Sequence, residues 1–371
     1  MNQYQMRLEK LFDWMAQESI TLAVFEDTEG RRDRTIRHLT GQPGDALLLL
    51  SLDRKTVLVP WDINMAKVYA HADMIIPYSE FERLPCKAIA VVAEMLGIPA
   101  GSKIEIPPVT PYPLFLNYVG KLTDFDILCR ERGLSAEARK IRAVKDDEEI
   151  KIYRKAAAVT NALIGLLEKN VRSGKIKTEA DAALLIEVEA RRHGCEGTGF
   201  ETLAAGPGRS FGIHAHPAWT DSPFAGPGLS ILDFGVRLAG YTTDVTLTFV
   251  REASPRQEKI AGLVEKAAKL AFSMAGNGTA ARSIALAVEE LFARAKKRMP
   301  HALGHGIGLE EHEYPAINSR SDNEWKIEPG MVFTLEPGLY DPLHGGCRLE
   351  NDILMTETGP ELLTEARTIR L

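Results

Sequence analysis

The chain has 371 residues, of which 45% are hydrophobic and 26% charged; this composition is typical of an ordinary globular protein and the length predicts two domains. The formal net charge of -6 is mixed along the chain without a basic run, which argues against nucleic acid or an anionic membrane as a partner. No apolar run reaches the roughly 18 residues of a bilayer span, and residues 1–15 form a candidate amphipathic helix rather than a signal peptide, so we expect a cytoplasmic protein.

Residues 1–136 alternate apolar strand-like runs with helical ones, which indicates an α/β domain. Arg31, Arg32, Arg34 and Arg37 cluster in a polar stretch, where a solvated loop is favoured over a contact to a substrate carboxylate. We expect strands at 22–25, 46–52, 57–60, 74–77, 104–106 and 124–129, and helices at 61–71, 81–96 and 111–119.

The pattern changes at residues 136–143, which we interpret as a charged connector, and a second domain is expected at 137–371. Capping-box patterns at 146–149 and 178–181 predict the starts of two helices. Two helices followed by paired strands occur twice in this half, which favours an internally duplicated α+β unit. The expected elements are helices at 146–170, 178–193, 255–275 and 279–297, loops at 197–228, a strand pair at 230–250, and strands at 331–336 and 348–355.

The strand pair carries two aspartates, Asp233 and Asp244, among apolar and β-branched residues. With a turn centred near Leu238 and Ala239, the two would lie directly opposite each other on antiparallel strands, with Cβ atoms about 4.5 to 5.5 Å apart. Alternation along each strand puts the neighbouring apolar residues on the other face. Two buried carboxylates on one face repel each other unless a proton or a cation lies between them.

Two further acidic residues occur with apolar strand-like runs. Glu336 ends one run and Glu350 lies within another, where glutamate is disfavoured. Exposed strand ends paired with Arg237 and Arg348 are the alternative explanation for any one of these carboxylates, but they explain the whole set less well.

The stretch at 300–313 holds His301, His305 and His312, and His305 lies between two glycines that allow other groups to approach its imidazole closely. A surface or core role is the ordinary alternative for any single histidine. Four carboxylates and one imidazole together suit Mn, Co, Fe or Zn in a two-metal centre.

The four cysteines are scattered without a CxxC pair, so neither a disulfide framework nor a thiolate zinc site is indicated. We expect buried or half-buried free thiols at Cys86, Cys129, Cys195 and Cys347.

Four motifs in the second half resemble those of a known family. D-x-G-x5-Y-x2-D starts at Asp233, G-H-G-I-G-L-E-x-H contains His305 and His312, L-E-P-G-L-Y contains Glu336, and R-L-E ends at Glu350. These spacings resemble the pita-bread metallopeptidases, in particular the prolidase and aminopeptidase P branch. The resemblance extends more loosely over nearly the whole chain.

The resemblance implies an α+β fold. It places a pita-bread catalytic domain at 137–371 and a smaller creatinase-like α/β domain at 1–136. It also implies a metallopeptidase, that is, a hydrolase that uses two divalent metal ions. Mn is preferred for these ions, with Co, Fe or Zn as alternatives.

Carried over by position, the resemblance implies a role for each ligand. Asp233 would chelate one metal ion, Asp244 and Glu350 would bridge both, and His305 and Glu336 would complete the second. Glu336 would also accept the proton of the attacking water.

Other matching positions would act around the metal ions. His312 matches the histidine that contacts substrate and stabilises the tetrahedral intermediate. Arg348 matches an arginine near the bridging carboxylate, and Tyr241 a tyrosine at the edge of the site. His301 is expected in a supporting position.

Two departures from the family pattern leave questions open. The loop before the hairpin has two histidines, His214 and His216, where the family has one; the distance to Asp233 selects His216 and the local G-I-H-A pattern selects His214. Ala316 stands where prolidases often have an arginine that holds the dipeptide carboxylate, which weakens a strict dipeptidase assignment.

The resulting hypothesis is a dinuclear metal-dependent enzyme that hydrolyses the bond between an N-terminal residue and proline, as an Xaa-Pro dipeptidase or an Xaa-Pro aminopeptidase. Short proline-containing peptides are the expected partners, with no nucleic acid and no membrane, and a homodimer is expected. The alternatives are a creatinase-like amidinohydrolase and a catalytically silent protein-binding relative. Trp219 could form part of the apolar wall that contacts the proline ring, or it could pack within its own domain. Cys347 is expected to make activity sensitive to thiol reagents.

Overall fold

The computed structural model describes residues 2–371, which divide into two compact units, residues 2–142 and 143–371. Helix α6, Leu134–Ala143, lies where a charged connector was expected. This segment is helical because alanine, glutamate, lysine and arginine favour helices, and because Leu134 and Ala138 pack into the core of the first unit. Residue 137 lies inside this helix, and the division into domains 1–136 and 137–371 stays a prediction.

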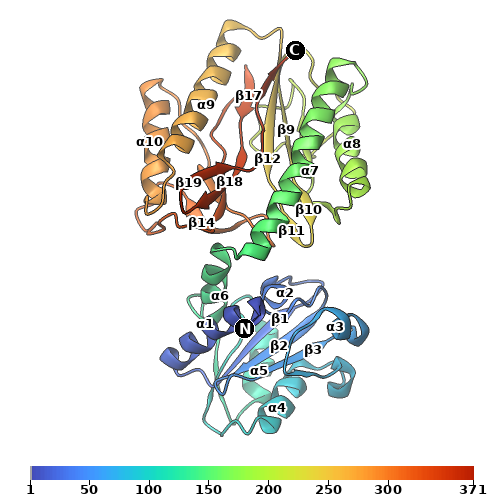
Figure 1. Cartoon of the computed structure of the whole chain (residues 1–371), viewed down its shortest axis with the longest axis vertical. Helices are drawn as coiled ribbons and strands as arrows, with labels where there is room; N and C mark the ends of the chain where they lie inside the picture. The colour runs from blue at the N-terminus through green and yellow to red at the C-terminus, as the bar shows by residue number, and fades with distance from the viewer. Residues whose placement is uncertain (1) are drawn as a thin grey trace. The chain divides into compact units, whose positions relative to one another are not determined.

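The first unit is built on a six-stranded sheet with the order β4-β3-β2-β1-β5-β6 (Figure 1). Along β1, Ala23 and Phe25 contribute to one core and Leu22 and Val24 to another, so the strand is buried on both faces by helices. The strands are β1 Leu22–Asp27, β2 Ala46–Ser51, β3 Thr56–Pro60, β4 Met74–Ile75, β5 Lys103–Glu105 and β6 Asp126–Leu128, and the helices are α1 Gln3–Glu18, α2 Thr35–Thr40, α3 Ile63–Tyr69, η1 Tyr78–Phe81, α4 Pro85–Met95 and α5 Tyr112–Lys121.

The arginine-rich stretch of this unit is more ordered than a solvated loop. Arg31 pairs with Glu26 at 2.7 Å, and Arg32 pairs with Asp27 at 3.3 Å. The following residues form the short helix α2, in which Ile36 is fully buried. Two of these guanidinium groups therefore neutralise buried carboxylates at the end of β1.

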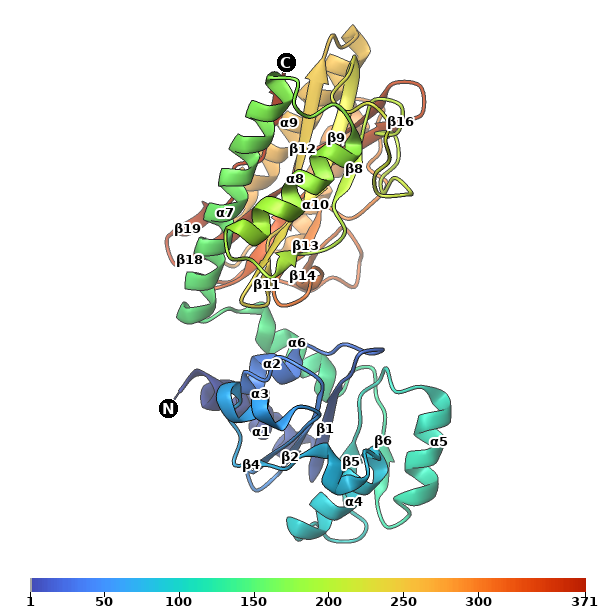
Figure 2. The same ribbon diagram turned by 90° about the vertical axis from the view of Figure 1, so that its right-hand side faces the viewer.

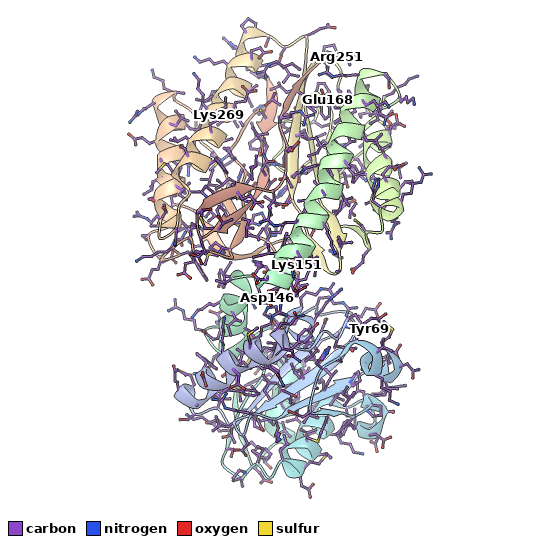
Figure 3. The ribbon with its side chains drawn as sticks, viewed as in Figure 1. Tyr69, Asp146, Lys151, Glu168, Arg251 and Lys269 are labelled. Atoms are coloured by element: carbon purple, nitrogen blue, oxygen red, sulfur yellow. The ribbon has the colours of Figure 1, made fainter. Side chains whose placement is uncertain are left out.

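In the second unit, helices α7 Asp147–Arg172 and α8 Glu179–Arg192 begin at the two predicted capping boxes. Figure 3 labels Asp146 and Lys151 at the start of α7 and Glu168 near its other end. Glu168 accepts a hydrogen bond of 2.8 Å from Arg172 and pairs with Arg367, which ties the C-terminal segment to the helix.

Helices α9 Pro255–Met274 and α10 Ala281–Arg294 lie on the other side of the strands from α7 and α8 (Figures 1 and 2). Two sheets have the orders β20-β12-β9-β8 and β14-β13-β15-β18-β19, and smaller ones β11-β10-β7 and β16-β17. The strands are β7 Gly197–Thr198, β8 Leu203–Ala205, β9 Gly228–Phe234, β10 Val236–Leu238, β11 Tyr241–Thr242, β12 Val245–Arg251, β13 Gly304–Gly306, β14 Glu313–Ile317, β15 Val332–Leu335, β16 Gly338–Asp341, β17 Gly345–Arg348, β18 Asn351–Thr356, β19 Gly359–Leu362 and β20 Thr368–Arg370.

Several elements of this unit differ from expectation, among them β7, which lies within the expected loops at 197–228. Strand β8 lies within the expected loops at 197–228, because Leu203–Ala205 are buried and pair with β9. The expected strand at 348–355 is divided between β17 and β18, and Glu350 lies at the break rather than inside a strand.

All four cysteines are free. Cys86, Cys195 and Cys347 are buried as expected, whereas Cys129 is exposed. Within residues 2–371, no helix combines the length and the apolarity needed to cross a bilayer, and the cytoplasmic location stays a prediction.

Candidate metal centre

A tight hairpin sets the position of the two aspartates. Ala239 and Gly240 have φ values of 49° and 87°, as in a type I′ turn, in which glycine is preferred because both central residues have positive φ. The turn is therefore centred one residue later than expected, and Asp233 lies opposite Thr246 rather than opposite Asp244. Because the register differs by two residues, the side-chain alternation is unchanged and both aspartates still face the same side.

Thr246 also joins this hairpin to the break between β17 and β18. Its amide nitrogen lies 3.4 Å from the carbonyl oxygen of Glu350, and its hydroxyl donates to Glu350 Oε2 at 2.7 Å. Glu350 is thereby brought beside Asp244. Asp244, His305 and Glu350 each offer one ligand atom, and these atoms all lie within 4.8 Å of one another.

His305 lies in β13, between β14 and β15. A Cβ atom at Gly304 would be 2.0 Å from the carbonyl oxygen of Thr334, and one at Gly306 would be 1.9 Å from that of Tyr314. Only glycine fits at either position, because the neighbouring strands approach too closely for a side chain. The two glycines thus allow β13, which carries His305, to lie close against the neighbouring backbone.

The imidazole of His305 is oriented by its own strand. Nδ1 lies 3.1 Å from the carbonyl oxygen of Gly306, so Nδ1 carries the proton and the lone pair of Nε2 is free. Nε2 lies 3.7 Å from Asp244 Oδ2 and 3.8 Å from Glu336 Oε1. Burial, together with His312, lowers the pKa of His305 to about 3, so the ring is neutral at physiological pH.

Burial also dominates the electrostatics of the carboxylates. It raises the pKa of Asp244 and of Glu336 well above the ordinary values, and Glu350 beside them adds to both shifts. Burial and then Asp233 raise the pKa of Glu350 itself to about 7. A protein without a cation here must therefore carry extra protons on this cluster near neutral pH.

Three buried oxygen atoms in this cluster have no hydrogen-bond partner among residues 2–371. They are Asp233 Oδ1, Asp244 Oδ1 and Glu350 Oε1. Buried polar atoms are normally paired, and hard oxygen atoms beside one neutral imidazole form a donor set for divalent transition metals. The side chains of Asp233, Asp244, His305, Glu336 and Glu350 therefore fit a metal centre.

Arg348 lies behind this cluster and is 1% exposed. Its guanidinium donates to Asp233 Oδ2 at 2.5 Å, to Thr246 Oγ1 at 2.9 Å and to the hydroxyl of Tyr340 at 2.8 Å. Burial opposes its charge, but Tyr340, Asp233 and nearby glutamates together raise its pKa. Arg348 thus fixes one oxygen of Asp233 and leaves the other free.

The cluster opens into a cavity of about 600 Å³. His214, His216 and His312 line it together with the five candidate metal ligands. All three histidines are exposed, and the structure therefore brings both His214 and His216 to the cavity without selecting between them.

Two side chains proposed near the site lie outside the cavity lining. The hydroxyl of Tyr241 donates to Glu149 of α7 at 2.7 Å, so Tyr241 joins the hairpin to that helix. Trp219 is 38% exposed and does not line the cavity; Phe200, Leu203 and Ile213 supply apolar surface there instead.

Three supporting residues, Thr246, Asp352 and Tyr340, escaped the sequence-based interpretation. Thr246 could have been found from its two-residue spacing to Asp244. Asp352 could have been found from its two-residue spacing to Glu350, and it accepts a hydrogen bond from the amide of Asp244 at 3.2 Å. His301 was placed only as a supporting residue, yet it lines the cavity and its Nε2 lies 3.0 Å from the hydroxyl of Tyr340. No local pattern marks Tyr340, because its role depends on a contact with Arg348.

Comparison with protein families gives a match over residues 151–357 to metallopeptidase family M24. An uncharacterised peptidase of Methanocaldococcus jannaschii is 33% identical over 235 residues, which are 63% of this chain and 67% of that protein. The Xaa-Pro dipeptidase of Pyrococcus horikoshii is 31% identical over 61% of this chain and 64% of its own. The Xaa-Pro dipeptidase of Pyrococcus furiosus is 27% identical over 97% of both chains. The match thus spans about two thirds of the first two relatives and nearly all of the third.

Solved structures with the same fold extend over the whole chain. The Xaa-Pro dipeptidase of Bacillus anthracis has a TM-score of 0.86 at 24% identity and covers 99% of this chain and 100% of its own. The X-Pro aminopeptidase of Thermotoga maritima has a TM-score of 0.82 at 24% identity over 98% and 99%. At these identities the likeness concerns the fold, and it confirms the architecture predicted from the sequence.

Proposed function

Because this chain belongs to metallopeptidase family M24, we propose that it is a dinuclear metal-dependent enzyme that hydrolyses the peptide bond between an N-terminal residue and proline. The resemblance to the pita-bread metallopeptidases is confirmed by the family match, and the chain is a metallopeptidase. The number and identity of the metal ions, the Xaa-Pro specificity and the homodimer belong to the proposal.

The observation that carries the proposal is the set of unpaired donor atoms in the cluster. Asp233, Asp244 and Glu350 each leave one buried oxygen without a partner, and the lone pair of His305 Nε2 faces Glu336 and Asp244. These five side chains would hold two divalent ions, with Mn preferred and Co, Fe or Zn as alternatives. When bound, such ions make water nucleophilic near neutral pH and polarise a carbonyl group.

The chain's own groups would move and hold protons around the bond. Glu336 lines the cavity, with Oε1 3.8 Å from His305 Nε2, and its carboxylate would accept the proton of the attacking water. His312 would donate to the developing oxyanion from the exposed part of the cavity, and His214 or His216 would contact the substrate. Arg348 would act indirectly, by fixing Asp233.

The cavity lining supports a proline-containing substrate. Phe200, Leu203, Ile213, Ala215 and Ala218 supply the apolar surface that a pyrrolidine ring requires. Acidic side chains and histidines make up most of the remaining lining, an environment that favours the positively charged amino terminus of a peptide. Dipeptides and longer Xaa-Pro peptides are both retained as substrates.

The test is hydrolysis of Ala-Pro, Ala-Pro-Ala and Ala-Ala by chelator-treated enzyme, before and after addition of Mn²⁺ or Co²⁺. Metal-restored cleavage confined to the Xaa-Pro bonds would support the proposal, and the preferred peptide would decide the subclass. Asp244→Asn should abolish the metal response, whereas Asp221→Asn, at an exposed aspartate of the same unit, should retain it. Metal binding without peptide cleavage would refute the proposal and favour an amidinohydrolase or a protein-binding role.

A further inference from the structure

The two histidines at the cavity lie in an irregular loop, residues 206–220, which follows β8 and precedes β9 in the chain. Ile213, His214, Ala215, His216 and Ala218 of this loop line the cavity. Both histidine side chains are exposed, so the packing of their own rings does not place them. Their positions must depend on contacts that hold the loop backbone.

Glu179, the first residue of α8, provides such contacts. Its side chain is completely buried, and its carboxylate binds both ends of the loop. Oε1 accepts from the amide of Gly206 at 2.7 Å. Oε2 accepts from the amide and the hydroxyl of Thr220 at 2.8 and 2.7 Å. A single carboxylate thus closes the loop at its two ends.

Arg209 extends this contact toward the histidines. One of its terminal nitrogens donates to Glu179 Oε2 at 2.5 Å, and the other donates to the carbonyl oxygen of Pro217, directly after His216. From the other side, Arg348 donates to the carbonyl oxygen of Ile213 at 2.9 Å. The backbone on both sides of the histidine pair is therefore held by guanidinium groups, that of the partly exposed Arg209 and that of the buried Arg348, and hydrogen bonds from charged groups are stronger than neutral ones.

We propose that Glu179 is a positioning residue that sets the loop carrying His214 and His216 at the substrate cavity. The inference rests on the proposed peptidase function. Glu179 lies outside the metal cluster and acts through the loop backbone, so its loss should affect substrate turnover more than metal binding. Gly206 is required here, because a Cβ atom at that residue would lie 2.1 Å from the carbonyl oxygen of Pro223.

The primary variant is Glu179→Gln, with Glu187→Gln as the matched control. Glutamine keeps one acceptor oxygen, but its NH₂ group replaces the other and faces N–H or O–H donors. At least one hydrogen bond between residue 179 and the loop is therefore lost. Glu187 lies on the same helix and pairs with Arg191 at the surface. We expect Glu179→Gln to lower kcat/KM for the best Xaa-Pro peptide by roughly 10- to 100-fold, while Glu187→Gln changes it by less than about twofold.

Two further measurements separate positioning from general damage. Mn²⁺ affinity, measured by calorimetry, should be the same in Glu179→Gln and wild type. In a His214→Ala/His216→Ala background, adding Glu179→Gln should lower kcat/KM by less than about twofold, because residues that act as a unit are not additive. An equal loss in both backgrounds, or a parallel loss of Mn²⁺ affinity, would overturn the proposal.

Hydrogen exchange tests the same inference without catalysis. Amides of residues 206–220 should exchange faster in Glu179→Gln than in wild type, whereas β15 and β18 should be unchanged. If Glu179→Gln does not fold, Arg209→Met serves in its place, because it removes the hydrogen bonds to Glu179 and to Pro217 but leaves Glu179 bound to Gly206 and Thr220. Unchanged exchange in the loop refutes the positioning role, and faster exchange in an enzyme that cleaves no Xaa-Pro peptide refutes the proposed function alone.

Discussion

Changing Glu350 to glutamine should separate the folding of the chain from its ability to bind metal. Glu350 is 2% exposed and lies beside Asp233 and Asp244. Thr246, which donates to Glu350 Oε2 at 2.7 Å, can donate equally well to an amide oxygen. The substitution therefore removes a buried carboxyl group and one proposed metal ligand but keeps the shape and the main hydrogen bond.

The size of the effect follows from the pKa of Glu350. Burial, with Asp233, raises this pKa from 4.5 to about 7 on folding. The folded protein then holds a proton that the unfolded chain has released, so stability falls as pH rises from about 4.5 to 7 and is constant above this window. At about 1.4 kcal/mol per pKa unit, burial of Glu350 lowers the free energy of unfolding by about 3 kcal/mol at pH 8 and by under about 1 kcal/mol at pH 5.

We therefore expect metal-free Glu350→Gln to be more stable than metal-free wild type at pH 8. For a unit of this size, about 3 kcal/mol corresponds to a rise in Tm of roughly 6 to 12 °C, and the rise should nearly vanish at pH 5. The same variant should lose the stabilisation by Mn²⁺ and the peptidase activity.

The assay is thermal unfolding of chelator-treated protein at pH 5 and pH 8, with and without added Mn²⁺. Glu361→Gln, at a half-exposed glutamate paired with Arg154, is the control and should behave as wild type at both pH values. A lower Tm for metal-free Glu350→Gln at pH 8, or a Mn²⁺ response equal to that of wild type, would refute this account of the carboxylate cluster.

Three further changes test other parts of the site. Cys347 is fully buried, and burial raises its pKa to about 12, so the sensitivity to thiol reagents expected from the sequence is no longer predicted. Alkylation with iodoacetamide should leave the rate of hydrolysis unchanged, while mass spectrometry shows the modification at Cys129. A loss of rate together with modified Cys347 would contradict this prediction. Gly306→Ala should destabilise the protein by about 2 kcal/mol or more in thermal unfolding, since its Cβ would lie 1.9 Å from a carbonyl oxygen. The control Gly165→Ala, whose Cβ would have nothing within 4 Å, should stabilise α7 by up to about 1 kcal/mol. Equal Tm values for the two variants would contradict the close approach of the strands at Gly306. His312→Ala should lower kcat by about 100-fold or more with calorimetric Mn²⁺ affinity unchanged, and a loss of affinity would place His312 among the ligands instead.

The hairpin shows how far local patterns predict a site. Alternation along the strands placed Asp233 and Asp244 on one face, and this holds in the structure although the register was wrong by two residues. The face depends on parity alone, which a two-residue error preserves. The register depends on the turn, which is a two-residue hairpin that needs positive φ values at Ala239 and Gly240. The sequence allows such a turn at more than one position, so it did not determine the register.

Glu350 and Arg348 show where local patterns end. The sequence places Glu350 in an apolar run, but its location at the break between β17 and β18 follows from the contact with Thr246, far away in the chain. Of the groups that accept from Arg348, Thr246, Ile213 and Asp233 likewise come from distant segments, whereas Tyr340 lies on the neighbouring strand β16. Motif spacing could identify these residues as functional by resemblance, whereas their hydrogen bonds depend on how the sheets pack.

Buried carboxylates in this chain fall into two groups that residue type and burial do not distinguish. Glu179 is fully buried and both of its oxygen atoms accept hydrogen bonds from the loop that it holds. Asp244 and Glu350 are nearly as buried, yet each leaves one oxygen unpaired beside other acidic groups. An unpaired buried oxygen is costly unless a proton or a cation satisfies it, so the unpaired atoms of Asp244 and Glu350 mark a candidate site for a cation, whereas both oxygen atoms of Glu179 already accept hydrogen bonds within the protein.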